Sequence, residues 1–584
     1  MAEFTPVPVE RGTPRQGGST AAGGRARPAG VLRWGVALVV VALVAGATSV
    51  GAVLLTSGAT TSAVEGWIPA GTVAYLEARA DLPGDQRENV GNIIATFPGF
   101  KDQSSLDSKI DQALDEALQK TGISWTSDLK PWVAGEVGVA LTGELLDIAA
   151  ADRRDPAAAA APDRGFVVLA NVKDVTAATD WVAKEAGGTA STSTYGDGTI
   201  TTVDRGGMTL AWATRGTVLL LGPEVTVKAA LDTHGASPIA ASSAFVAAKS
   251  AAPGAYLGFG YLDTATLLQS LVSMAGNPTG VPAACLDSAM AAAPAWSAGF
   301  AQATGGALVI DHVAPAGAAG AGASPAPTDT VSAIAAHLPA TTLVAIEGRQ
   351  VGPALVALWS GMEARIACDP AGKAALDKVD TALAAIGGVG SLAGWAGDAA
   401  LAVTRDGTEW GGGLAAIATD PAAATRTLDQ LRAVLALAGG GAGITTTQEP
   451  YAAGTITVVT LPALAGMGAT GAVTPPLAVS AQGSLFAIGT VDFVKAVLDT
   501  PASAGLASQA GYQNAINVAG GAGIMDAYFN ITGIRAGLEA LIPAADQARY
   551  ATDVQPFLEP FDAFAAVEKA PAGTRTTRFA LVFK

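Results

Sequence analysis

The chain has few of the side chains that carry most enzyme chemistry. Its 584 residues include two cysteines and three histidines, and only 14% of them are charged. His234, His312 and His337 stand far apart, whereas a metal site normally draws its ligands from a recognisable spacing. No GxSxG, HExxH, CxxC or Walker motif occurs. The sequence therefore predicts no catalytic residue, no metal site and no cofactor.

Positive charge is also scarce, and this excludes a further class of partner. The net charge is −16. The first 33 residues contain five arginines and two glutamates, a net +3, so the rest of the chain carries −16 − 3 = −19. Such an acidic chain repels phosphate backbones, which excludes nucleic-acid binding. Acidic pairs such as Asp111 and Asp115 have the spacing of a solvated helix face.

One long stretch lacks charge altogether. Residues 34–55 read "WGVALVVVALVAGATSVGAVLL", which is long enough for a helix to cross a bilayer. The preceding residues 1–33 are rich in Pro and Gly, so we expect a disordered tail, and their positive charge favours a cytoplasmic location. The sequence thus predicts a single-pass membrane protein with its C-terminal part outside the cytoplasm. Cleavage of the apolar run as a signal peptide is the alternative.

The rest of the chain repeats itself in order. "VKAALDT" at 227–233 recurs as "VKAVLDT" at 494–500, and "PAGT" at 69–72 recurs as "PATT" at 339–342. Matched segments kept in order over such a distance are typical of a duplication. We expect two homologous lobes, at 66–313 and 336–584, joined by a Pro/Ala/Gly linker at 314–335.

Local patterns favour an α+β fold. "TVAYLEAR" and "GFVVLANV" have the character of strands, and Asp369 before Pro370 has the pattern of a helix start. Each lobe is predicted to hold about seven strands and four or five helices, with a largely antiparallel sheet covered by helices on one face. Glu77 and Arg79, two residues apart, are interpreted as a charge pair at a strand edge.

Cys285 and Cys368 are the two cysteines. They fall in different lobes and on the predicted outer side of the membrane, where thiols are oxidised. We expect a disulfide that joins the lobes, with two free buried thiols as the alternative.

Three features together indicate a family. These are the "WIPAGTVAYLEA" segment after the apolar run, the Trp-Gly segments at 132–135 and 395–397, and the double layout. In these features the chain resembles domain of unknown function family 3352, found in bacterial envelope proteins. The resemblance covers most of residues 66–584 and implies no catalytic residues.

Three functions fit these observations. The preferred hypothesis is a membrane-anchored extracytoplasmic binding or scaffold protein without catalytic activity, whose partner is an unknown envelope protein. The second is a carrier of a lipid or another apolar envelope molecule, since a sheet under helices can enclose one. The third is an envelope hydrolase with an unrecognised acidic site.

Overall fold

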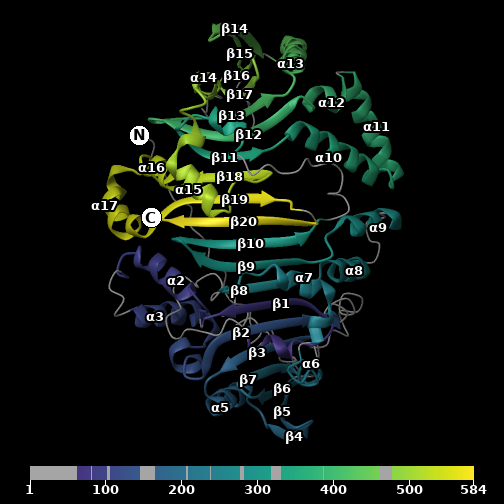
Figure 1. Ribbon diagram of the computed structural model, residues 1–584, viewed down its shortest axis with the longest axis vertical. Coiled ribbons are helices and arrows are strands. Elements are labelled where there is room, and N and C mark those ends of the chain that lie inside the picture. Colours follow the sequence, from purple (N-terminus) through teal and green to yellow (C-terminus); the bar gives the residue numbers. More distant parts are fainter. Residues whose placement is uncertain are drawn as a thin grey trace, which may run out of the picture.

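The computed structural model has the predicted α+β character, with helices packed on one large antiparallel sheet (Figure 1). It describes residues 62–584 with gaps at 81, 101–105, 145–164, 206–207, 237, 276–281, 317–330, 386, 443, 461–475 and 572. The predicted tail at 1–33, the predicted transmembrane helix at 34–55 and residues 317–330 of the predicted linker lie outside the described residues. Within the described part, no helix combines the length and apolar character needed to cross a bilayer.

The first half of the described chain contributes ten strands. They are β1 (Thr72–Arg79), β2 (Val133–Thr142), β3 (Phe166–Val172), β4 (Ser191–Tyr195), β5 (Gly198–Arg205), β6 (Met208–Arg215), β7 (Val218–Pro223), β8 (Gly258–Leu262), β9 (Ser297–Thr304) and β10 (Ala307–Pro315). Their order across the sheet is β4-β5-β6-β7-β3-β2-β1-β8-β9-β10, and every neighbouring pair is antiparallel.

The second half contributes ten more strands. They are β11 (Thr342–Gly348), β12 (Ala396–Asp406), β13 (Glu409–Ala418), β14 (Thr445–Tyr451), β15 (Gly454–Thr460), β16 (Leu477–Gln482), β17 (Leu485–Thr490), β18 (Met525–Asn530), β19 (Phe561–Lys569) and β20 (Thr574–Phe583). Their order, β14-β15-β16-β17-β13-β12-β11-β18-β19-β20, matches that of the first half position by position.

The expectation of about seven strands per half was too low. Some of the additional strands have no apolar alternation that a sequence pattern could reveal. β4 reads "STSTY" and β14 reads "TTTQEPY", and most of their side chains are exposed. Such outer strands are held by backbone pairing with β5 and β15 rather than by a buried face.

The two halves meet edge to edge and form one 20-stranded sheet. β10 pairs with β20 in antiparallel register from Ala307 opposite Val582 to Pro315 opposite Thr574. Across this seam the guanidinium of Arg578 donates two hydrogen bonds to the Asp311 carboxylate, at 2.6 and 2.9 Å. Figure 1 shows the sheet running without a break from β4 at the bottom to β14 at the top.

Helices connect the strands in both halves. Those of the first half include α2 (Gln86–Ala95), α3 (Leu106–Leu118), α5 (Val175–Ala186), α6 (Glu224–Leu231), α7 (Ser243–Ser250), α8 (Thr264–Ala275), α9 (Ala283–Ala292) and a π-helical turn (Trp125–Leu129). Those of the second half are α10 (Val351–Ile366), α11 (Pro370–Ala384), α12 (Gly388–Ala393), α13 (Pro421–Ala442), α14 (Val491–Asp499), α15 (Ala510–Val518), α16 (Ile531–Glu539), α17 (Ala544–Asp553) and α18 (Gln555–Leu558).

The first half carries helices on both faces of its sheet, not on one as expected. We call face A the side covered by α6 and α7, where Val227 and Phe245 pack on Val167 and Leu169. Face B is the opposite side. There α2, α3, α5 and the π-helical turn bury the alternate residues, such as Val168, in a separate core. Face A of the second half is covered in the same way by α14 and α15.

The repeated segments 227–233 and 494–500 lie largely in α6 and α14. Each of them contacts a β-hairpin of its own half. Tyr195 at the β4–β5 hairpin donates a hydrogen bond of 2.9 Å to Asp232, and the Lys228 ammonium lies 5.1 Å from the centre of its ring. In the second half the same contacts join Tyr451 to Asp499 and Lys495. Lys and Asp recur in the phrase because, in each half, both of them contact the tyrosine of the hairpin.

Candidate functional site

Face B exposes a set of large apolar side chains on four strands of the second half and on β10, the strand of the first half that forms the seam. We call this set the open face; its members, with their exposed fractions, are Ile310 (46%), Ile346 (39%), Leu401 (54%), Leu414 (39%) and Phe579 (36%). They come from five different strands, β10, β11, β12, β13 and β20. Single exposed apolar residues are normal in soluble proteins, but a contiguous group marks an interaction surface.

The five side chains stand in one row across the sheet. Leu414 lies opposite Leu401, and Leu401 lies opposite Ile346. The pairing then continues through two small residues, Ala527 and Ala566, to Phe579 and Ile310. Residues directly opposite each other point to the same face, so the row spans seven strands, or roughly 30 Å at a strand spacing of about 4.8 Å.

Helices at the two ends of these strands expose further apolar residues. α10 packs against β12 and α12, whereas α16 packs against β11, β18 and β19. In Figure 1, α10 lies to the right of these strands and α16 to the left. The exposed apolar side chains are Leu355, Leu358 and Met362 on α10, Leu538 on α16, and Leu541 just after α16. Apolar side chains are therefore exposed in these helical regions as well as on the open face.

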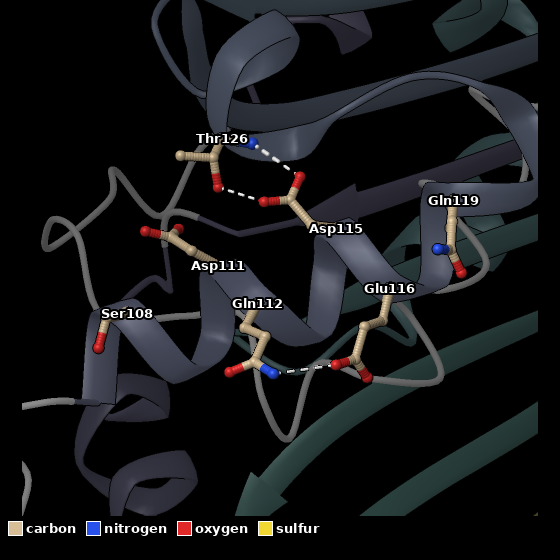
Figure 2. A pocket seen from close by; sticks show the side chains of 7 residues that line it. All are labelled: Ser108, Asp111, Gln112, Asp115, Glu116, Gln119 and Thr126. Carbon is tan, nitrogen blue, oxygen red and sulfur yellow. Dashed lines mark hydrogen bonds between the residues drawn. The ribbon is translucent and has the colours of Figure 1, made fainter.

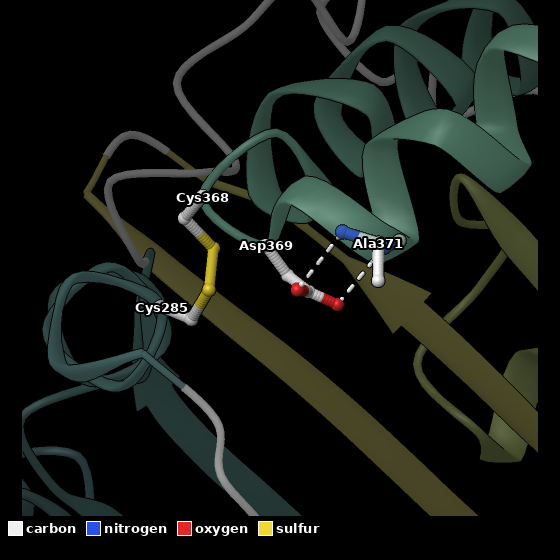
Figure 3. The surroundings of a disulfide bond; sticks show 5 residues. Cys285, Cys368, Asp369 and Ala371 are labelled. Carbon is white, nitrogen blue, oxygen red and sulfur yellow. Dashed lines mark hydrogen bonds between the residues drawn. A yellow bond between two sulfur atoms is a disulfide. The ribbon is translucent and has the colours of Figure 1, made fainter.

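The expected disulfide between Cys285 and Cys368 is present, with 5.4 Å between the two Cα atoms (Figure 3). It links α9 of the first half to the α10–α11 connection of the second. Asp369 follows at once and caps α11, because its carboxylate accepts hydrogen bonds from the backbone of Ala371 and Gly372, as its position before Pro370 predicts. The Cys285–Cys368 disulfide therefore cross-links the two halves next to α10, one of the helices at the ends of the open-face strands.

The two halves bury a matching carboxylate in the middle of the sheet. Glu77 and Glu347 are both 1% exposed, on β1 and β11. Glu77 accepts hydrogen bonds from Tyr75 (2.9 Å) and Tyr256 (3.0 Å), whereas Glu347 accepts one from Tyr512 (2.9 Å). Burial raises the pKa of Glu77 and raises that of Glu347 to about 7.

The interpretation of Glu77 and Arg79 as a charge pair at a strand edge was wrong. β1 lies between β2 and β8, so neither residue is at an edge, and Arg79 is 2% exposed. In the second half Arg349 pairs with Asp526 at 3.0 Å. Buried groups with raised pKa values are common at catalytic sites, but these carboxylates lie inside the packed sheet with tyrosine partners.

An acidic surface pocket lies on α3. Figure 2 shows its lining, and its volume is about 470 Å³. Asp115 accepts hydrogen bonds from Ser124 and Thr126, while Asp111 accepts one from the Trp125 indole and pairs with Lys130. These carboxylates fix the π-helical turn against α3. They are therefore not the freely solvated pair that their spacing predicts.

The histidines lie on separate parts of the fold. His312 is in β10, His234 follows α6 with a φ of 50°, and His337 follows a 3-10 turn that ends at Ala336. Among the described residues, no group of three or more His, Cys, Asp and Glu is arranged to hold a metal ion.

A family model described as "Protein of unknown function (DUF3352)" matches residues 36–584. The chain belongs to this family. This confirms the resemblance seen in the sequence. No curated protein matches the chain.

One solved structure, titled "Structure of crystal form III of TP0453", is 8% identical and covers 44% of this chain and 82% of its own, with a TM-score of 0.20. A likeness this weak carries no argument about fold or function.

The sequence did not point to the open face. Leu401 and Leu414 alternate with small buried residues as any core strand does. The one signal in the sequence is the alternation of apolar residues along these strands, and such an alternation predicts a face covered by helices.

Proposed function

We propose that this chain is an extracytoplasmic binding protein of the cell envelope, anchored by residues 34–55, whose open face holds a long apolar ligand. The observation that carries the proposal is the row of exposed side chains from Leu414 to Ile310. Monomeric soluble proteins rarely expose contiguous apolar patches of more than a few hundred Å² without a partner. We also infer that the halves arose by duplication, which is supported by their matching strand order.

The chemistry of the surface favours a hydrocarbon ligand over a peptide. Extended peptides are usually recognised at sheet edges, where the backbone offers free hydrogen-bonding groups. The open face lies on interior strands, whose backbone groups are paired within the sheet. It therefore presents side chains alone. A row about 30 Å long suits a linear apolar chain. The scaffold hypothesis, in which a protein covers this face, is an alternative outcome of the test below.

The test uses the full chain in membranes from cells that express it. A hexadecanol carrying a photoreactive diazirine is added, cross-linked by light, and located by peptide mass spectrometry. We expect labelling of residues 396–418, which contain Leu401 and Leu414. Leu401→Asp combined with Leu414→Asp should reduce this labelling about a hundredfold or more, because burial of two leucine side chains contributes about 3 kcal/mol or more.

The matched control is Val225→Asp in the first half, where Val225 is 53% exposed. This change should leave the labelling intact. Labelling confined to residues 34–55, or a cross-link that joins residues 396–418 to another protein, would overturn the proposal of an apolar small-molecule ligand.

A further inference from the structure

Arg405 is a cation on the open-face side of the sheet. It follows Leu401 by four residues in β12, so both side chains point to face B. The guanidinium lies 5.9 Å from the ring centre of Trp410, which stands opposite on β13 and is 43% exposed. A cation, an exposed indole and apolar side chains therefore share one surface.

Among the described residues, no carboxylate pairs with Arg405. Its Nε is buried and has no hydrogen-bond partner. The nearest acidic residues in the chain are Asp406 and Glu409, at the tip of the β12–β13 hairpin. Strand alternation directs both of them to face A, away from the guanidinium. The terminal nitrogens of the same guanidinium are not among the enclosed donors and make no hydrogen bond within the described residues, so they are the atoms that would bind an anion.

Helix α16 packs against both Arg405 and Trp410. Gly537 lies so close that a Cβ atom at this position would be 2.7 Å from the Trp410 ring and 3.3 Å from Cδ of Arg405. The absence of a side chain at Gly537 lets the helix pack directly on both residues. Arg405 is thus fixed by Trp410 and α16, which orders the guanidinium before any ligand arrives.

We infer that the ligand of the open face is a single-chain lipid with a carboxylate head group, which is bound by Arg405 while its chain follows Leu401 and Leu414. This inference rests on the proposed function and extends it to a ligand class. One guanidinium neutralises one negative charge, and its planar geometry matches a carboxylate. Arg405 lies four residues from Leu401, about 13 Å along β12 and therefore to one side of the row. A long acyl chain can span that distance and reach Leu401 and Leu414, the two members of the row nearest to Arg405.

The test compares two photoreactive probes of the same length on the full chain in membranes, hexadecanoate and hexadecanol. We expect the carboxylate to label residues 396–418 about tenfold more strongly, the factor that one charge-assisted hydrogen bond provides. Arg405→Gln should lower hexadecanoate labelling to the level of hexadecanol and leave hexadecanol labelling unchanged. Arg405→Lys should restore part of the preference, since it keeps the charge but loses the planar fork.

The control is Arg426→Gln on α13, an exposed arginine of the same half that pairs weakly with Asp420 at 3.8 Å. It should preserve the preference for the carboxylate. If Arg405→Gln leaves hexadecanoate labelling unchanged, or if wild type labels equally with both probes, the inference is wrong while the proposed function stands. If neither probe labels residues 396–418, the proposed function itself fails.

Discussion

The two halves share their strand order but differ in what covers face B. In the first half Leu76, Val139 and Val168 stand opposite one another on β1, β2 and β3, and the two valines are 6% and 4% exposed. Leu401 and Leu414 occupy the matching positions on β12 and β13 and are 54% and 39% exposed. These matched positions therefore lie in a core in the first half and at the surface in the second, where face B keeps only a smaller core under α13.

The difference lies in the helices that follow the matching strands β1 and β11. In the first half α2 and α3 bury Ile93, Leu114 and Leu118 in the core on face B. In the second half α10 packs at the end of the sheet against α12, and the disulfide ties the α10–α11 connection to α9. The same strand order can thus carry a covered face or an exposed one, depending on where the helices pack.

The strongest test of this comparison exchanges matched residues. Val139→Asp should lower the free energy of unfolding by about 4 kcal/mol or more, because it buries a carboxylate without a partner. Leu401→Asp at the equivalent position should change it by less than about 1 kcal/mol, since the side chain is exposed. Urea unfolding followed by circular dichroism measures both. Equal losses would mean that face B of the second half is covered in solution.

Removal of the cross-link should have an intermediate effect. Cys285→Ser with Cys368→Ser is expected to lower the free energy of unfolding by about 2–4 kcal/mol, because the bond closes a long loop in the unfolded chain. Hydrogen exchange should rise in α10 and α11 and stay unchanged in α2 and α3. Exchange that stays slow in α10 and α11 would show that packing alone positions them.

The smallest expected effect concerns pH. Burial raises the pKa of Glu347 to about 7 from the usual 4.5, so the unfolded chain loses this proton at a lower pH than the folded one. The free energy of unfolding is then highest below pH 4.5 and falls as the pH rises toward 7, by about 1–3 kcal/mol from this group. Glu347→Gln should flatten that slope, whereas Glu409→Gln at an exposed position should not. An unchanged slope in the first variant would contradict the raised pKa.

Several elements were predictable because their signals are local. Asp369 before Pro370 marks a helix start wherever it occurs, and the repeated phrase marks two equivalent helices. The α+β class followed from short alternating runs, and the pairing of Cys285 with Cys368 followed from their number and predicted compartment.

The features that the sequence could not reveal depend on distant partners. Glu77 is buried on a strand between β2 and β8, and its carboxylate accepts a hydrogen bond from Tyr256, 179 residues away. The seam between β10 and β20 joins segments 267 residues apart, as the Asp311–Arg578 pair shows. Whether the open face is exposed depends on where the helices pack. The alternation of apolar residues along a strand is the same for a covered face and for an exposed one.

The seam also limits how the molecule can change shape. Because β10 and β20 are joined by a full antiparallel ladder, a hinge between the halves would have to tear that ladder apart. The two halves therefore form one continuous sheet. Movement around the open face is therefore left to the peripheral helices, and the disulfide restrains the α10–α11 connection among them.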